Sequence, residues 1–178
     1  MVVHDTSGSS QSLKVEVYSD STEAMVSMTG VLDEKASLKN IQLGEPRVII
    51  FELSGLRLLN SSGIRTWVHW IRELEAKSPR PIVLFRKCTK PFIDQVNAIS
   101  GFLPQGATVE SFFVPYYCEN CGQTQSELFV VGKQFSRATA DSEMVVNSPK
   151  AIHCLACGEK MEMDVMPAKY FSFLQYRR

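Results

Sequence analysis

Two short units of identical form, Cys-x-x-Cys-Gly, constrain this chain more than any other feature of its sequence. The first, CENCG, contains Cys118 and Cys121, and the second, CLACG, contains Cys154 and Cys157. A two-residue spacer lets a tight turn present two thiolates to one metal ion, and the glycine permits the reversed backbone that follows. Two such turns predict a closed, tetrahedral four-thiolate site, the usual geometry of structural zinc, with one Zn²⁺ per chain.

Other uses of paired cysteines fit the sequence less well. Disulfides are rare in a reducing cytoplasm, a thioredoxin-like redox pair is usually single, and haem attachment needs a histidine where both units have glycine. His153 adjoins the second unit and could be an alternate ligand, but four thiols already complete the site. Such a site has no open position for a catalytic water. Cys88 stands alone and is expected to be a buried small hydrophobe.

The cysteine units lie in residues 116–178, a segment too short to bury much apolar surface. Metal binding supplies roughly 10–16 kcal/mol in such small domains, which would fold a segment with a thin core. The 32 residues between the units exceed the usual spacing of about 15–20. The strand-like stretches SELFVVG and SEMVVN within them predict an extended hairpin. We therefore expect a small, β-rich, zinc-ribbon-like C-terminal domain.

Residues 13–115 follow a polar, Ser-rich stretch, residues 1–12, which is expected to be a flexible tail. LKVEVYS and EAMVSMTG predict a hairpin joined by the turn SDST, and DEKASLKNI predicts a helix with Asp33 as its N-cap. RVIIFELSG and PIVLF predict buried strands, TKPFIDQVNAISG a helix, and ATVESFFVP a final strand. This alternation indicates an α/β domain with a mixed sheet backed by helices.

The most regular helical pattern begins within LLNSSGIRTW. Its apolar residues recur on one face of a 3.6-residue period, at Ile64, Trp67, Val68, Ile71 and Leu74. Trp70 lies off that stripe, so it is expected to be an exposed interface anchor or to be covered by the C-terminal segment. Ser61 or Ser62 is expected to cap the helix. The same free amides would stabilise a phosphate, which Arg65 could pair with.

Around these serines the chain resembles a known family. VSMTGVLDEKASL, VIIFELSGLRLLNSSGIRTWVHW and PIVLFRKCTKPFIDQVNAISGF are similar, in this order, to the motifs of STAS domains, the family of bacterial anti-anti-sigma factors. The resemblance implies a four- or five-stranded mixed sheet backed by helices that acts as a protein-binding switch. It implies that Ser61 is the serine that a partner kinase phosphorylates, in a switch region of Asn60, Ser61, Ser62 and Gly63. The family usually has Asp at the position of Asn60, and its common pattern has no cysteine-rich tail.

Charge narrows the classes of partner. The formal net charge of the chain is zero, and the C-terminal segment has no basic stripe, which argues against nucleic acid. A nucleic-acid-binding regulator that uses the zinc segment is the alternative function. Between Leu56 and Ile93, however, eight basic residues stand against two acidic ones. This excess indicates an acidic partner that contacts Arg65 and Arg72, or else a solvated helix face.

Together these patterns predict a non-enzymatic, cytoplasmic protein-interaction module in bacterial signalling. The sequence has no apolar run of membrane length and no signal peptide. It also has no phosphate loop, zinc-protease motif, nucleophile elbow or dinucleotide turn, so no residue is assigned as catalytic. The expected partner is an anti-sigma-type kinase or another signalling protein, and a homo-oligomer is compatible with the sequence.

Overall fold

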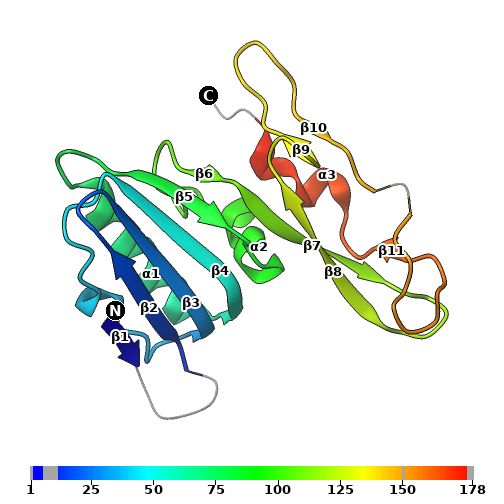
Figure 1. Cartoon of the computed structure of the whole chain (residues 1–178), viewed down its shortest axis with the longest axis horizontal. Coiled ribbons are helices and arrows are strands. Elements are labelled where there is room, and N and C mark those ends of the chain that lie inside the picture. Colours follow the sequence, from blue (N-terminus) through cyan, green and yellow to red (C-terminus); the bar gives the residue numbers. More distant parts are fainter. Residues whose placement is uncertain (1, 6–11, 150, 176–178) are drawn as a thin grey trace. The chain divides into compact units, whose positions relative to one another are not determined.

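The computed structural model describes residues 2–5, 12–149 and 151–175. The chain is mixed α/β, with a mixed sheet and few helices, as predicted (Figure 1). It divides into two compact units, Met1–Glu110 and Ser111–Arg178. The boundary expected after residue 115 falls within strand β7 (Ser111–Tyr117).

The first unit contains one mixed sheet with the strand order β1-β2-β3-β4-β5-β6 (Figure 1). Its strands are β1 (Val2–Asp5), β2 (Lys14–Ser19), β3 (Glu23–Leu32), β4 (Val48–Leu59), β5 (Ile82–Arg86) and β6 (Thr108–Val109). β2 is antiparallel to β1 and to β3, so the predicted hairpin is confirmed, whereas β3 to β6 run parallel. β1 forms where the sequence predicts a tail, and it adds an edge strand to the sheet.

The hairpin between β2 and β3 is closed by the side chain of Asp20. Its Oδ1 accepts hydrogen bonds from the backbone N–H groups of Thr22, at 2.7 Å, and of Glu23, at 2.8 Å. These bonds hold the pKa of the Asp20 carboxyl below its ordinary value. A short acidic side chain that bonds the following amides favours a turn over a continued strand, which fixes the hairpin here.

Two helices, α1 (Ser61–Glu75) and α2 (Lys90–Ala98), pack against the same face of this sheet. The ring of Trp67 on α1 lies 5.4 Å from Phe51 on β4 and 5.5 Å from Phe92 on α2, between ring centroids. Phe92 in turn lies 5.5 Å from Phe85 on β5. The indole N–H of Trp67 donates to the carbonyl of Phe102 at 2.9 Å, so this buried ring leaves no polar group unsatisfied.

The expectation that Trp70 lies off the buried stripe is wrong. Trp70 is only 4% exposed and packs edge-on against Phe51, at 5.6 Å between centroids. The buried face of α1 runs through Gly63, Trp67, Trp70, Ile71 and Leu74. The helix is therefore rotated relative to the stripe predicted from the sequence, and Ile64 and Val68 are only half-buried.

Two other local predictions fail. Asp33 does not cap a helix: its Oδ1 accepts from the amide of Lys35 at 3.0 Å in a turn, and only the short 3₁₀ helix η1 (Leu38–Asn40) follows. ATVESFFVP is not one strand, since it divides at Glu110 into β6 and β7, which belong to different sheets. The Glu110 amide donates to the carbonyl of Phe85 at 2.8 Å, and its carboxylate accepts from Arg86 Nε at 2.6 Å. Both bonds hold Glu110 to β5.

Cys88 is fully buried, as predicted.

The second unit contains a three-stranded sheet and a two-stranded hairpin. β8 (Thr124–Val130) and β11 (Glu162–Met163) flank β7, and β9 (Phe135–Ser136) pairs with β10 (Val145–Val146). The extended hairpin predicted from SELFVVG and SEMVVN is therefore wrong, because β8 pairs with β7 while β10 pairs with β9 in a separate sheet. The short helices α3 (Pro167–Tyr170) and η2 (Ser172–Leu174) end the described part of the unit.

The core of the second unit is aromatic. The ring of Phe112 lies within 6.1 Å, between centroids, of five others: Phe129, Phe135, Tyr170, Phe171 and Phe173. Such rings bury about 150–250 Å² each, so this unit has more core than its length suggests. Within the described part of the chain, none of the helices has the length and apolar character required to cross a bilayer.

Candidate functional site

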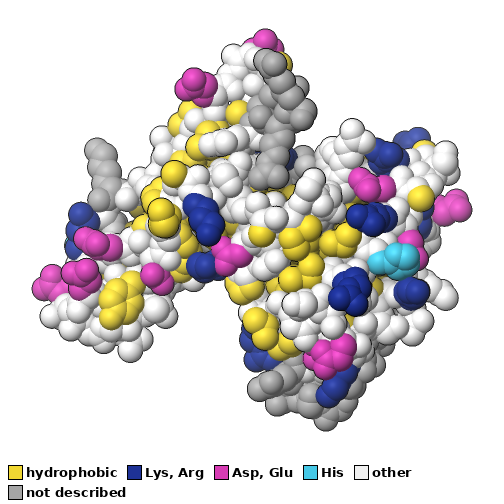
Figure 2. All heavy atoms as spheres, turned by 180° about the vertical axis from the view of Figure 1, so that it is seen from behind, with side chains coloured by type: hydrophobic (Ala, Val, Ile, Leu, Met, Phe, Trp, Pro, Cys, Tyr) yellow, Lys and Arg dark blue, Asp and Glu magenta, His cyan; other side chains and the backbone are white. Residues whose placement is uncertain are grey.

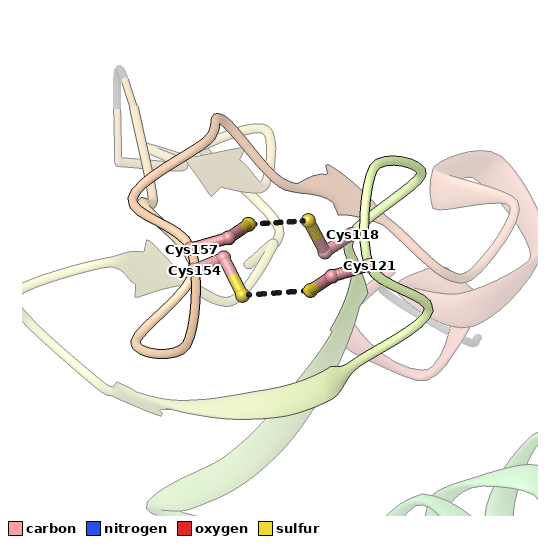
Figure 3. A group of neighbouring side chains, drawn as sticks. All are labelled: Cys118, Cys121, Cys154 and Cys157. Carbon is pink, nitrogen blue, oxygen red and sulfur yellow. Dashed lines mark hydrogen bonds between the residues drawn. The ribbon is translucent and has the colours of Figure 1, made fainter.

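The four paired cysteines converge in the second unit. Two loops face each other, one carrying Cys118 and Cys121 and the other Cys154 and Cys157, and the side chains of each loop point toward the other (Figure 3). The Sγ atoms of Cys118 and Cys157 are 3.5 Å apart, as are those of Cys121 and Cys154. All four sulfurs lie within 4.8 Å of one another, so the sequence-predicted ligands form one cluster that could hold a metal ion.

The two loops have the same backbone hydrogen bonds. In the first, the carbonyl of Cys118 accepts from the amide of Gly122 at 2.8 Å, and in the second the carbonyl of Cys154 accepts from Gly158 at 2.8 Å. The glycines have φ values of 72° and 77°, a region that side chains disfavour. The repeated Cys-x-x-Cys-Gly sequence thus produces one turn twice, with both thiols of each turn on its inner side.

The spacing of the sulfurs suits a tetrahedral metal. Four sulfurs placed about 2.3 Å from a zinc ion would be separated by about 3.8 Å, close to the distances in this cluster. Cys118 and Cys154 are buried, whereas Cys121 and Cys157 are exposed. One side of the cluster is therefore enclosed by protein, and the other side is open to solvent.

The surroundings shift the pKa values of the two exposed thiols in opposite directions. The amide of Glu159, followed by the side chain of Asn120, lowers the pKa of Cys157 to about 6. The amide of Gln123 favours the Cys121 thiolate in the same way, but the hydrogen bond to Cys154, desolvation and the other thiols raise the pKa of Cys121 to about 12. Four thiols this close cannot all ionise unless a cation compensates their charge, which a bound metal ion would do.

His153 is not a member of the cluster. Its Nδ1 lies 3.0 Å from the carbonyl oxygen of Gly158, and its backbone bridges to Lys160. The ring therefore supports the second cysteine turn rather than adding a fifth donor to the site.

At the serine junction, Asn60 is the N-cap of α1 in place of the predicted Ser61 or Ser62. Its Oδ1 accepts from the amide of Gly63 at 2.9 Å, and its backbone is extended. Ser61 is the first residue of the helix, and it is exposed. Asparagine and serine cap helices about equally well, so the sequence alone does not distinguish a start at residue 60 from one at residue 61.

The amide group of Asn60 is used twice. Besides capping α1, it donates from Nδ2 to Glu34 Oε2 at 2.9 Å, and this bond is the main reason that the pKa of Glu34 is below its ordinary value. An aspartate at this position, as in the family that the sequence resembles, has no N–H to donate. No periodic pattern links residues 34 and 60, so the sequence alone does not predict this pair.

Gly63 allows α1 to approach the end of β3. A Cβ placed on Gly63 would lie 1.9 Å from the carbonyl oxygen of Leu32. That same carbonyl accepts from the amide of Asn60 at 3.1 Å. The Asn60–Gly63 stretch is therefore held tightly against the sheet, and Ser61 projects from a fixed backbone.

The basic excess between Leu56 and Ile93 is partly neutralised by acids that lie outside that stretch of the sequence. Arg86 pairs with Glu110, Lys90 with Asp94 and, at 3.8 Å, Lys87 with Glu52. On the face that Figure 2 draws, Lys and Arg side chains lie close to acidic ones.

Among the described residues, Arg65 and Arg72 form no ion pair, and both are exposed on α1.

Comparison of the chain with protein-family models, with curated proteins and with solved structures gave no match.

Proposed function

We propose that this protein is a non-enzymatic protein-interaction module of bacterial signalling, as its resemblance to STAS domains implies. The observation that carries the proposal is one exposed stripe on α1 formed by Ser61, Arg65 and Arg72. At about 100° per residue, these three positions fall within about 40° of one another around the helix. A stripe that combines a hydroxyl with two cations that form no ion pair among the described residues suits an acidic protein surface.

The arrangement of the first unit supports the same proposal. Its parallel strands β3 to β6 follow one another in order, and both long helices cover one face. A mixed sheet backed by helices is compatible with what the resemblance implies, although this sheet has six strands where four or five are expected. The stripe begins at the carboxyl end of β4, where a rigid cap and a close helix–sheet contact hold it.

Phosphorylation of Ser61 would act on this stripe directly. A phosphate on the first residue of α1 would meet the free amides of the helix start and the guanidinium of Arg65, one turn away. It would also neutralise the positive charge that an acidic partner recognises. Asn60 leaves the capping geometry intact without the carboxylate that the family usually carries there.

For the cysteine cluster we propose one structural zinc ion per chain, in a zinc-ribbon-like second unit. Four thiolates select soft or borderline ions, of which zinc favours a tetrahedral site. With four protein ligands the ion would hold the two turns together rather than activate water. A reducing compartment such as the cytoplasm would keep these thiols available for the metal.

A binding experiment tests the interaction function. The tagged chain is used to recover proteins from the native cell, and the Arg65→Glu/Arg72→Glu double variant is compared with Lys35→Glu/Lys39→Glu, which reverses two exposed charges elsewhere in the first unit. We expect a specific partner whose association is several-fold slower for the first variant only, with a strong salt dependence.

Equal recovery by the two double variants would contradict the proposed face. Recovery of nuclease-sensitive material that is released by moderate salt would instead favour the alternative, a nucleic-acid-binding regulator. Intact-mass measurement of the recovered chain reports a phosphate on Ser61, and sedimentation of the purified chain reports self-association.

A further inference from the structure

A hollow of about 590 Å³ opens in the first unit, at the amino ends of β4 and β5. Two loops form it, residues 44–47 before β4 and residues 77–81 before β5. β4 begins beside this hollow and ends just before Ser61, and its twelve residues span more than about 30 Å. The hollow is therefore separate from the proposed partner-binding stripe.

The walls of the hollow are held in place. The amide of Ile82 donates to the carbonyl of Arg47 at 2.8 Å, and the amide of Arg47 donates to Thr22 at 2.8 Å. Lys77 Nζ crosses between the loops to the carbonyl of Gly44 at 3.0 Å. Three prolines in the lining further restrict the loops: Pro46, Pro79 and Pro81. The hollow is thus formed before any ligand arrives.

The charge of the lining is mostly positive. Arg47, Lys77 and Arg80 stand against one acidic residue, Glu45. None of these three cations takes part in an ion pair among the residues that the structure describes. Lys77 donates to a carbonyl, and Arg80 donates to the side-chain oxygen of Gln105 at 3.2 Å. Both acceptors are neutral, and with Glu45 counted the three cations leave the lining with an excess of two positive charges.

Apart from Ser78 and Gly44, the rest of the lining is apolar. Ile82 is 60% exposed at the start of β5, and it lies in the hollow with Ile49 and the three prolines. A ligand that removes an aliphatic side chain from water in this setting binds more favourably, because burial of apolar surface lowers the free energy. The volume is also within the range of about 300–1,000 Å³ of small-molecule sites.

We propose that this hollow binds a small amphipathic anion, with an apolar body against Ile82 and the prolines and an acidic head group at Arg47 and Arg80. The head group can be a carboxylate, a phosphate or a sulfonate, since each accepts the paired N–H bonds of a guanidinium. This site does not depend on the proposed protein-binding function, because it uses other residues at the opposite edge of the sheet.

The test compares two dyes on the full-length, metal-replete chain. Anilinonaphthalene sulfonate carries an aromatic body and an anionic head, and N-phenyl-1-naphthylamine has the same rings without the charge. We expect the wild type to bind the sulfonate saturably. The Arg47→Gln/Arg80→Gln variant should bind it about tenfold more weakly, at about threefold per cation. The affinity for the neutral dye should change little in this variant. Lys77 is left intact because it joins the two loops.

The matched control is Arg65→Gln/Arg72→Gln, which removes two exposed cations from α1 and should leave sulfonate binding unchanged. Backbone amide shifts on titration should concentrate in residues 44–49 and 77–82. Three results would each overturn the proposal: no saturable binding of the sulfonate, equal binding by the two double variants, or amide shifts elsewhere in the chain. Competition by inorganic phosphate and by a fatty acid then distinguishes a preference for a phosphate head group from a preference for a carboxylate.

Discussion

Asn60 joins two elements that are distant in sequence: its Oδ1 caps α1 at Gly63, while its Nδ2 donates to Glu34 Oε2 at 2.9 Å. One amide side chain thus holds both the start of the helix and the turn after β3. An aspartate would retain the first interaction and would oppose the second with a like charge. The pair makes the role of Asn60 testable.

Asn60→Asp should destabilise the chain at neutral pH and less so in acid. In the wild type, the bond from Asn60 keeps the pKa of Glu34 low. The stability that this bond contributes is therefore present above the pKa of Glu34 in the unfolded state, and it is lost as pH falls through the pKa of Glu34 in the folded state. In the variant two carboxylates face each other and the pKa of the pair rises in the folded state. The resulting penalty is present at high pH and disappears on protonation. Urea unfolding at pH 7 and pH 4 measures both trends.

The control for this prediction is a second substitution that restores a donor. Glu34→Gln in the Asn60→Asp background should recover stability at pH 7, because the glutamine amide can donate to the new carboxylate. Asn60→Ala should lose about 1 kcal/mol through loss of the cap, and somewhat more at pH 7 than at pH 4, because the bond to Glu34 is lost as well. If Asn60→Asp has the same stability difference from wild type at both pH values, the two side chains do not interact in solution.

Gly63→Ala should lower the free energy of unfolding by about 3 kcal/mol, since α1 must move away from the Leu32 carbonyl to admit a methyl group. Gly106→Ala is the control: its φ is 80° but nothing lies within 4 Å of the added Cβ, so it should cost only about 1 kcal/mol. Chemical denaturation followed by Trp fluorescence compares the two. Equal losses would mean that the close contact is not required.

Much of this fold follows from local patterns. The strands of the hairpin, the buried runs that become β4 and β5, and both long helices are correctly predicted by the spacing of apolar residues. The convergence of the four cysteines is predicted from repetition alone, because the same five-residue turn positions two thiols each time. These features are encoded within a few neighbouring residues.

The errors arise where distant contacts decide the outcome. Trp70 is buried because of the sheet beneath α1, and the helical period alone does not reveal how a helix is rotated on its support. The division of ATVESFFVP at Glu110 depends on the Arg86 and Phe85 contacts, with no proline or glycine to mark it. The choice of Asn60 over Ser61 as the cap depends on Glu34, which lies 26 positions earlier.

Metal removal should destabilise the second unit and leave the first intact. We expect one zinc per chain by mass spectrometry of protein purified without added metal, and none in Cys154→Ser. Both tryptophans lie in the first unit, so the unfolding transition reported by their fluorescence should keep its midpoint temperature. The transition reported by the near-UV circular dichroism of the tyrosines should move to a lower temperature.

His153→Ala is the matched control for the metal site, because its ring contacts the Gly158 carbonyl outside the sulfur cluster. This variant should retain the full metal content. A chain that is free of metal and yet melts at the wild-type temperature would show that the aromatic core around Phe112 is sufficient and that the cluster is not a structural site.

Substitution of Ser61 separates a structural role from a signalling role, because Asn60 already provides the cap. Ser61→Ala should change the free energy of unfolding by less than about 0.5 kcal/mol, as expected for an exposed position. Ser61→Asp should be neutral or stabilising by about 0.3–1 kcal/mol, since a negative charge at the helix start is favourable. Neither change disturbs the fold, so an effect on partner binding reports on the surface itself.

If the alanine variant binds the partner normally and the aspartate variant does not, added negative charge beside Arg65 is what the partner detects. Equal binding by both variants would rule out a charge switch at Ser61.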